Sequence, residues 1–332
     1  MKAFITASIT DDCLIELKKL MDVTYEPWRK TGIIYFDVKA LVEKLVDIDV
    51  FITETDDLKK EKLFEQTKLK LLISCRGDPF NVNLKAATEN KILVLNTPLR
   101  NVEAVAELTL GHMLMLARNL HKVERTLHSD DFELLDFDDY IEYLNQFQGF
   151  ELHGKTVGII GLGQIGRRVA DRLKAFGSKF LIYDPFIPDE LAEQYGKIVD
   201  IDVMMKEADI ITLHTVATDD NDNLINQNRI AMMKKTAILI NTSKGSLVDY
   251  DALYNALKEN RIAGAALDVF PMEPVDEDNE FLELDNAIVS PHIGGDTFEV
   301  VERQSDLLLK DIKAWLNDQK PKNIINPEVF KK

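Results

Sequence analysis

Short apolar runs alternate with amphipathic segments in the first hundred residues. The strands predicted from the apolar runs are residues 2–7, 50–53, 69–74 and 92–95. Helical spacing of apolar positions predicts helices at residues 11–21, 37–46, 58–66 and 84–90. Strands that alternate with helices predict a parallel sheet covered by helices. We therefore expect one α/β domain here, without a glycine pattern that could cradle phosphates.

The same alternation returns after residue 155. Predicted strands are residues 157–160, 180–183, 209–214, 237–241, 264–269 and 287–290. Predicted helices are residues 167–176, 226–233, 250–260 and 298–316. Six parallel strands are the usual size of a doubly wound dinucleotide-binding sheet. The predicted fold class is therefore α/β, with two doubly wound parallel-sheet domains.

The segment between these two patterns has a different character. A helix that begins at Asn101 is apolar almost all round, which is typical of a buried helix, and its start is the first predicted domain boundary. Residues 129–150 are acidic and rich in aromatic side chains. We expect this segment to be an arm that covers a partner subunit, and the alternative is a lid on its own domain.

The most informative stretch is residues 155–184. An apolar strand is followed at once by GLGQIG, with glycines at 161, 163 and 166, and then by an amphipathic helix. Gly161 permits the tight turn, Gly163 lets a pyrophosphate approach the backbone, and Gly166 lets helix and strand pack closely. The free N–H groups at the helix N-terminus favour an anion. This strand–turn–helix unit predicts a dinucleotide site.

Asp184 ends the next predicted strand, 18 residues beyond Gly166. An acid at this place accepts hydrogen bonds from a ribose diol and repels a 2′-phosphate. The following residues, Pro185 to Ile187, supply no arginine or lysine. The sequence therefore favours NAD over NADP.

Composition excludes several classes of protein. The net charge of −17 argues against nucleic acid and an anionic membrane as partners. Two cysteines make no disulfide framework, and no metal-ligand cluster is visible. No signal peptide and no apolar run of about 20 residues is present. We expect a cytoplasmic globular protein without a metal.

Charged and titratable residues follow three predicted strands of the second domain. Lys244 follows one strand, Asp268 and Glu273 follow the next, and His292 follows the last. The carboxyl ends of parallel strands share one sheet edge, where ligands collect. A cation there can hold a carboxylate, and an imidazole oriented by a carboxylate can exchange a proton. In the first domain Arg76 also follows a strand, and it could meet an anion or be a solvated surface residue.

The chain resembles the D-isomer-specific 2-hydroxyacid dehydrogenase family. The motifs that carry the resemblance are NTP at 96–98, NVEAVAE at 101–107, HGKTVGIIGLGQIGRRVA at 153–170, INTSKGSLVD at 240–249, ALDVFPMEP at 266–274 and SPHIGG at 290–295. The resemblance implies a flavodoxin-like substrate domain (residues 1–101 and 296–332) with a Rossmann-type NAD-binding domain (residues 102–295) inserted. It also implies a homodimer, with a dimerisation arm at about residues 121–152.

The resemblance also implies roles for individual residues. His292 is expected to be the catalytic acid/base, Glu273 its carboxylate partner, and Lys244 a catalytic and substrate-binding cation where the family usually has arginine. Substrate-binding residues are expected to be Arg76, Gly77, Asp78 and Lys244. Cofactor-binding residues are expected to be Gly161, Gly163, Gln164, Ile165, Gly166, Asp184, His214, Thr242, Ser243, Asp268, Gly294 and Gly295. His214 could equally be structural.

Two hypotheses about function follow. The first is an oxidoreductase that transfers a hydride between NAD(H) and a small D-2-hydroxy acid or 2-oxo acid. The second is a non-enzymatic NAD(H)-sensing protein on the same fold, because a fold alone does not fix a function. Glu273 and His292 favour the enzyme, whereas lysine at position 244 keeps the second hypothesis open.

Overall fold

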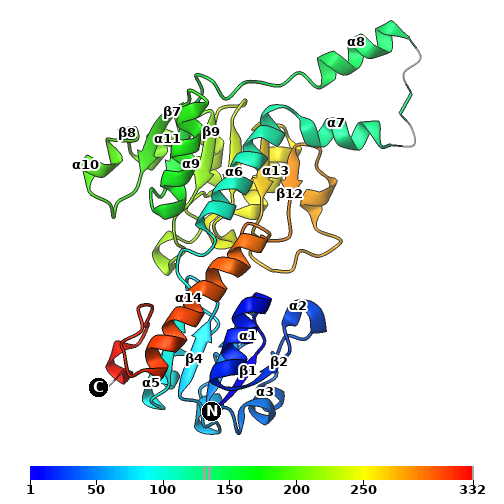
Figure 1. The fold of residues 1–332 in the computed structure, drawn as a ribbon. Helices are drawn as coiled ribbons and strands as arrows, with labels where there is room; N and C mark the ends of the chain where they lie inside the picture. The colour runs from blue at the N-terminus through cyan, green and yellow to red at the C-terminus, as the bar shows by residue number, and fades with distance from the viewer. Residues whose placement is uncertain (130–131, 134–135, 331–332) are drawn as a thin grey trace. The chain divides into compact units, whose positions relative to one another are not determined.

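A computed structural model describes residues 1–129, 132–133 and 136–330 of the chain. The chain divides into two compact units (Figure 1). Unit 1 comprises residues 1–100 and 297–332, and unit 2 comprises residues 101–296. Each unit contains one parallel sheet covered by helices, which confirms the predicted α/β fold class.

Unit 1 contains a five-stranded parallel sheet with the strand order β2-β1-β3-β4-β5. Its strands are β1 (Lys2–Ile5), β2 (Asp22–Tyr25), β3 (Val50–Thr53), β4 (Leu71–Ser74) and β5 (Leu93–Asn96). Its helices are α1 (Asp11–Leu20), α2 (Trp28–Thr31), α3 (Val38–Leu45), α4 (Lys62–Glu65), α5 (Leu84–Glu89) and α14 (Phe298–Leu316). Two apolar cores, one on each face, bury the strands on both sides.

Two predictions in unit 1 were wrong in detail. Strand β2 was not predicted, because its sequence Asp-Val-Thr-Tyr is half polar and leaves its residues partly exposed at the sheet edge. The helix predicted at residues 58–66 is reduced to the short α4. The backbone of Leu58 instead bridges to Val82, so that part of the apolar pattern reflects burial rather than a helix.

Unit 2 contains a seven-stranded parallel sheet with the order β12-β11-β10-β9-β6-β7-β8. Its strands are β6 (Thr156–Ile160), β7 (Lys179–Tyr183), β8 (Lys197–Ile198), β9 (Ile210–Leu213), β10 (Ile238–Asn241), β11 (Gly264–Leu267) and β12 (Ala287–Val289). We predicted six strands. The seventh, β8, is a two-residue edge strand whose residues are exposed, so no apolar run marks it.

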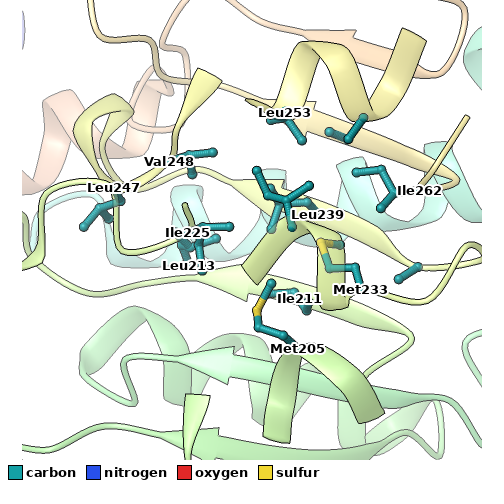
Figure 2. Close-up of a cluster of buried hydrophobic side chains, with 14 of the residues drawn as sticks. Met205, Ile211, Leu213, Ile225, Met233, Leu239, Leu247, Val248, Leu253 and Ile262 are labelled. Atoms are coloured by element: carbon teal, nitrogen blue, oxygen red, sulfur yellow. The ribbon is translucent and has the colours of Figure 1, made fainter. Parts of the chain in front are cut away.

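Helices cover both faces of the sheet in unit 2. The helices are α6 (Val102–Ala117), α7 (Leu120–Leu127), α8 (Phe137–Gln146), α9 (Gln164–Ala175), α10 (Asp189–Ala192), α11 (Ile201–Glu207), α12 (Gln227–Met232) and α13 (Tyr250–Lys258). Side chains of α6 and α9 form one apolar core, and those of α11, α12 and α13 form the other. Figure 2 shows part of the second core, where Met205, Leu239 and Leu253 lie among other buried side chains.

The segment predicted as an arm contains α7 and α8. Helix α8 has no buried residue, and Figure 1 shows it away from the sheet of unit 2. Residues 130–131 and 134–135 of the predicted arm lie outside the described residues. Among the helices that the structure describes, none combines the length and the apolar character needed to cross a bilayer.

Candidate active site

The glycine-rich turn joins β6 to α9 as predicted from the sequence. Gly161 has a φ of 89°, and a Cβ atom there would lie 2.7 Å from backbone atoms of His214 and Thr215. A Cβ atom on Gly166 would lie 2.1 Å from the carbonyl oxygen of Gly161. Side chains are therefore excluded at both positions, because the turn packs against the loop after β9 and against its own helix.

Gly163 has a different environment. It precedes the first residue of α9, and a Cβ atom there would meet nothing within 4 Å. Gln164 and Ile165 form the first turn of α9, whose unpaired N–H groups face the space beside Gly163. An anionic group can approach the backbone here, so the turn suits a pyrophosphate.

Asp184 follows β7 and is tied to the glycine-rich turn. Its Oδ2 atom accepts a hydrogen bond from the backbone N–H of Leu162 at 2.8 Å, and its Oδ1 atom accepts one from Phe186 at 2.9 Å. These bonds fix the orientation of the carboxylate next to the turn. An oriented acid beside a phosphate-binding turn matches the arrangement that holds the ribose diol of NAD.

The residues after β9 and β10 form a second part of the site. The His214 ring lies 2.9 Å from the Thr212 hydroxyl, and burial lowers the pKa of His214 to about 3, so the ring is neutral. The Ser243 hydroxyl donates to the carbonyl oxygen of Thr215 at 2.5 Å. The Thr242 hydroxyl lies 2.9 Å from that of Thr109 on α6. These contacts join the two loops and α6 to one another.

His292 and Glu273 form the titratable pair predicted from the sequence. The His292 Nδ1 atom lies 2.6 Å from Glu273 Oε2, and Glu273 Oε1 accepts a hydrogen bond from the Phe270 backbone at 3.1 Å. Burial raises the pKa of Glu273. The hydrogen bonds from His292 and Phe270 and the charges of His292 and Lys244 lower it by more, so that the net pKa is below its usual value. Glu273 is therefore ionised near neutral pH.

Close packing of two loops explains why Lys244 lies near this pair. Gly245, next to Lys244, lies against the backbone of Phe270, and a Cβ atom there would be 2.1 Å from the Phe270 carbonyl carbon. Asn241 donates to the Lys244 carbonyl oxygen at 2.9 Å and so fixes the start of the loop. The exposed side chain of Lys244 thus accompanies Glu273 at the carboxyl edge of the sheet.

Asp268 has contacts that the sequence did not predict. Its side chain is 1% exposed, and its carboxylate accepts hydrogen bonds from Ile293 N and Gly294 N, each at 2.8 Å, and from the Ser290 hydroxyl at 2.6 Å. Between these donors, the His292 backbone has a φ of 57°, a left-handed conformation that is uncommon outside glycine. Asp268 therefore holds the turn that carries His292.

The remaining predicted residues lie in two places, the turn after His292 and the loop after β4 in unit 1. A Cβ atom on Gly294 would lie 2.9 Å from Asp268 Oδ2, and Gly295 lies beside Asn101 at the start of α6. Arg76, Gly77 and Asp78 belong to unit 1, in the loop after β4. There the Arg76 guanidinium lies 4.4 Å from the Phe80 ring centre, and its Nε atom donates to the Glu54 carbonyl oxygen at 2.6 Å.

Comparison with known proteins identifies the family. Residues 110–294 match the family model described as D-isomer specific 2-hydroxyacid dehydrogenase, NAD binding domain. The chain belongs to this family. Residues 110–294 are therefore its NAD-binding domain, which confirms the resemblance and the predicted cofactor.

Relatives of this family are similar to almost the whole chain. A D-3-phosphoglycerate dehydrogenase of Methanocaldococcus jannaschii is 37% identical over 98% of the chain, and the chain spans 59% of that relative's length. A glyoxylate reductase of Thermococcus litoralis is 35% identical, with 99% of the chain and 98% of the relative covered. A solved D-lactate dehydrogenase of Aquifex aeolicus, complexed with NAD and lactic acid, is 28% identical with a TM-score of 0.78, over 98% of this chain and 99% of that one.

The sequence did not reveal several polar residues that lie around the turn of His292 and the loop of Glu273. Ser290, His112 and Tyr250 are three of them. The Tyr250 hydroxyl donates to the Val269 carbonyl oxygen, between Asp268 and the loop of Glu273. His112 is a polar residue on the largely apolar α6, and this signal does not reveal a partner 178 residues away.

Proposed function

We propose that the protein is an NAD(H)-dependent oxidoreductase that interconverts a small 2-oxo acid and the corresponding D-2-hydroxy acid. The observation that carries the proposal is the hydrogen bond between His292 and Glu273, at the same sheet edge as the glycine-rich turn. Membership of a family of 2-hydroxyacid dehydrogenases supports the same reaction class.

His292 and Glu273 supply acid–base chemistry. When bound, NADH supplies the hydride for the carbonyl carbon of the 2-oxo acid. Because Nδ1 of His292 faces Glu273, Nε2 is the ring atom left to donate a proton to the carbonyl oxygen. The ionised Glu273 fixes the ring orientation and stabilises the protonated imidazole through opposite charge. In the reverse direction Nε2 accepts the proton of the hydroxyl group.

Lys244 supplies positive charge for the substrate. Its effect on the pKa of Glu273 supports a position close to the catalytic pair. A lysine ammonium attracts a carboxylate or a developing alkoxide as a mobile point charge, whereas arginine offers a planar, bidentate fork. We propose that Lys244 binds the substrate carboxylate and that Arg76, Gly77 and Asp78 contribute further contacts.

The cofactor contacts follow from the described turn. We propose that Gly161 to Gly166 hold the pyrophosphate and that Asp184 accepts hydrogen bonds from the ribose hydroxyls. His214, Thr242, Ser243, Asp268, Gly294 and Gly295 complete the predicted set. The Asp184 carboxylate disfavours the 2′-phosphate of NADP by charge repulsion.

A reductase screen tests the proposal. Glyoxylate, pyruvate and longer 2-oxo acids are supplied with NADH and NADPH in parallel, and loss of reduced cofactor is followed by absorbance. We expect turnover of at least one acid, with NADH preferred. Tight NADH binding without turnover of any acid would contradict the proposal and favour a non-enzymatic NAD(H)-sensing protein.

We also propose that residues 121–152 are the arm of a homodimer. On α8, Phe137 is 70% exposed and Leu144 is 55% exposed, and several large exposed apolar side chains on one helix are typical of an interface. The double variant Phe137→Glu/Leu144→Glu should convert the dimer to a monomer in sedimentation. The control is Phe36→Glu in unit 1, where the side chain is 66% exposed. A mass unchanged by the double variant would contradict the role of the arm.

A further inference from the structure

A buried chain of hydrogen-bonding groups leads from α6 to the turn of His292. The Nε2 atom of His112 lies 3.4 Å from the Ser290 hydroxyl oxygen, and that oxygen lies 2.6 Å from Oδ1 of Asp268. His112 is 3% exposed and Ser290 is 7% exposed. These hydrogen bonds join helix α6, the loop after β12 and the end of β11.

The direction of the hydrogen bonds follows from the groups involved. The Asp268 carboxylate can only accept, so the single Ser290 hydroxyl proton points to it. The Ser290 oxygen must then accept from His112, which places the ring proton on Nε2. Nδ1 of His112 is buried and has no partner among the described residues, which fits an unprotonated nitrogen. Burial lowers the pKa of His112 and keeps the ring neutral.

Asp268 connects the Ser290 hydroxyl to the turn that carries His292. Its two carboxylate oxygens accept from Ile293 and Gly294, the two residues that follow His292. The left-handed backbone of His292 needs such support, because this conformation costs a non-glycine residue free energy. A carboxylate that lost its bond to Ser290 could rotate, and the turn would lose its fixed direction.

We propose that His112 and Ser290 are positioning residues: they orient Asp268, which holds the turn of His292 so that its ring meets Glu273. The inference rests on the proposed function for its consequence in catalysis. His112 is well placed for this role, because it lies on α6, a long helix with most of its residues buried. Neither residue touches the reacting atoms in this account.

The kinetic test uses His112→Phe, Ser290→Ala and the double variant. We expect each single variant to lower kcat by about tenfold to a hundredfold, because small misplacements of catalytic groups have effects of this size. The NADH dissociation constant should change less than kcat, because the glycine-rich turn and Asp184 are not altered. The double variant should lose no more kcat than the more impaired single variant, because both changes break the same series of hydrogen bonds. His112→Gln, which keeps an N–H donor, should retain most of kcat.

A second readout needs no turnover. In hydrogen–nitrogen correlation spectra of the histidine rings, Ser290→Ala should shift the signals of both His112 and His292. His128→Phe serves as the control, because His128 is exposed and distant in the chain from the turn. If the wild type reduced no 2-oxo acid and the His292 signal still responded to Ser290→Ala, the proposed function would fail and the positioning role would stand.

The proposal has clear contradicting results. His112→Phe and Ser290→Ala variants with wild-type kcat and unshifted His292 ring signals would overturn it. Losses of activation free energy that add in the double variant would also overturn it. Independent effects add, whereas two changes that break one series of hydrogen bonds do not. A lowered melting temperature with normal kcat in the folded protein would assign these residues to stability alone.

Discussion

At the scale of single residues, the site depends on a histidine in a strained backbone conformation. His292 has a left-handed φ of 57°, and only neighbours that over-determine such a conformation keep it. Asp268 holds this backbone by accepting hydrogen bonds from the next two N–H groups, and Glu273 holds the ring through Nδ1. These contacts fix the orientation of the ring.

Lys244 gives the first prediction at this scale. The Lys244→Arg variant replaces a mobile point charge by a planar fork and should change the relative kcat/KM values among 2-oxo acids by about tenfold, about one charge-assisted hydrogen bond. The measurement is the same panel of acids for both proteins. An equal change for every acid would contradict a selective role. Lys206, a surface lysine on α11, gives the control variant Lys206→Arg.

The sequence predicted the positions of these residues after strands, but it did not predict the contacts that hold them. The types and order of Lys244, Glu273 and His292 follow from motifs placed after strands, and motifs are local. The contact between His112 and Ser290 joins positions far apart in the chain, so no local pattern encodes it. Asp268 was expected to contact the cofactor, and its bonds to the turn of His292 required coordinates to find.

At the scale of elements, the turn between β6 and α9 contains glycines in two different environments, one closely packed and one open. Gly166 is required by packing, because a Cβ atom there would lie 2.1 Å from the Gly161 carbonyl oxygen. Gly163 is not, because a Cβ atom there would meet nothing within 4 Å. If Gly163 is kept for the cofactor, the two positions should respond differently to the same substitution.

The prediction compares Gly166→Ala with Gly163→Ala. Gly166→Ala should lower the free energy of unfolding by about 1–3 kcal/mol, the usual cost of overpacking, and also weaken NADH binding. Gly163→Ala should weaken NADH binding with little change in unfolding. Denaturant unfolding and NADH fluorescence titration measure the two quantities. A Gly163→Ala protein that binds NADH like the wild type would contradict the assigned place of the pyrophosphate.

Elements were predictable from the sequence where burial was complete. The central strands of both sheets are apolar runs buried on two faces, and all of them were predicted. The edge strands β2 and β8 were missed, because an edge strand can be short and polar without losing its backbone pairing. The turn residues of α9 were predictable, because glycine spacing is set by backbone geometry.

At the scale of the whole molecule, buried histidines link stability to pH. Burial lowers the pKa of His112, His121 and His214, the last to about 3, and an unfolded histidine has a pKa of about 6.5. The unfolded chain therefore binds more protons than the folded one below about pH 6.5. Stability is fully present above this pH and is lost as the pH falls from about 6.5 towards 3.

The prediction is a loss of stability on mild acidification. The free energy of unfolding should be lower at about pH 5.5 than at about pH 7.5, by at most about 1.4 kcal/mol per pH unit for each such histidine. His214→Gln should make this dependence shallower, because it removes a buried neutral ring. Equal slopes in the His214→Gln protein and the wild type would contradict a buried neutral ring.

The chain as a whole combines a dinucleotide-binding unit with a hydrogen-bonded histidine–glutamate pair at the carboxyl edge of the same sheet. Family membership supports the proposed reaction class, and the residues at the edge support the roles proposed above. Lysine at position 244, the buried chain under His292 and the exposed α8 are features of this sequence that the reaction class alone does not explain.

The most direct test of the central claim is a comparison of wild type with His292→Ala. The two quantities are the NADH dissociation constant and kcat for the best 2-oxo acid found in the screen. We predict a nearly unchanged dissociation constant and a loss of about 10²–10⁴-fold in kcat, the range typical of a general acid. Unchanged turnover in His292→Ala would contradict the account.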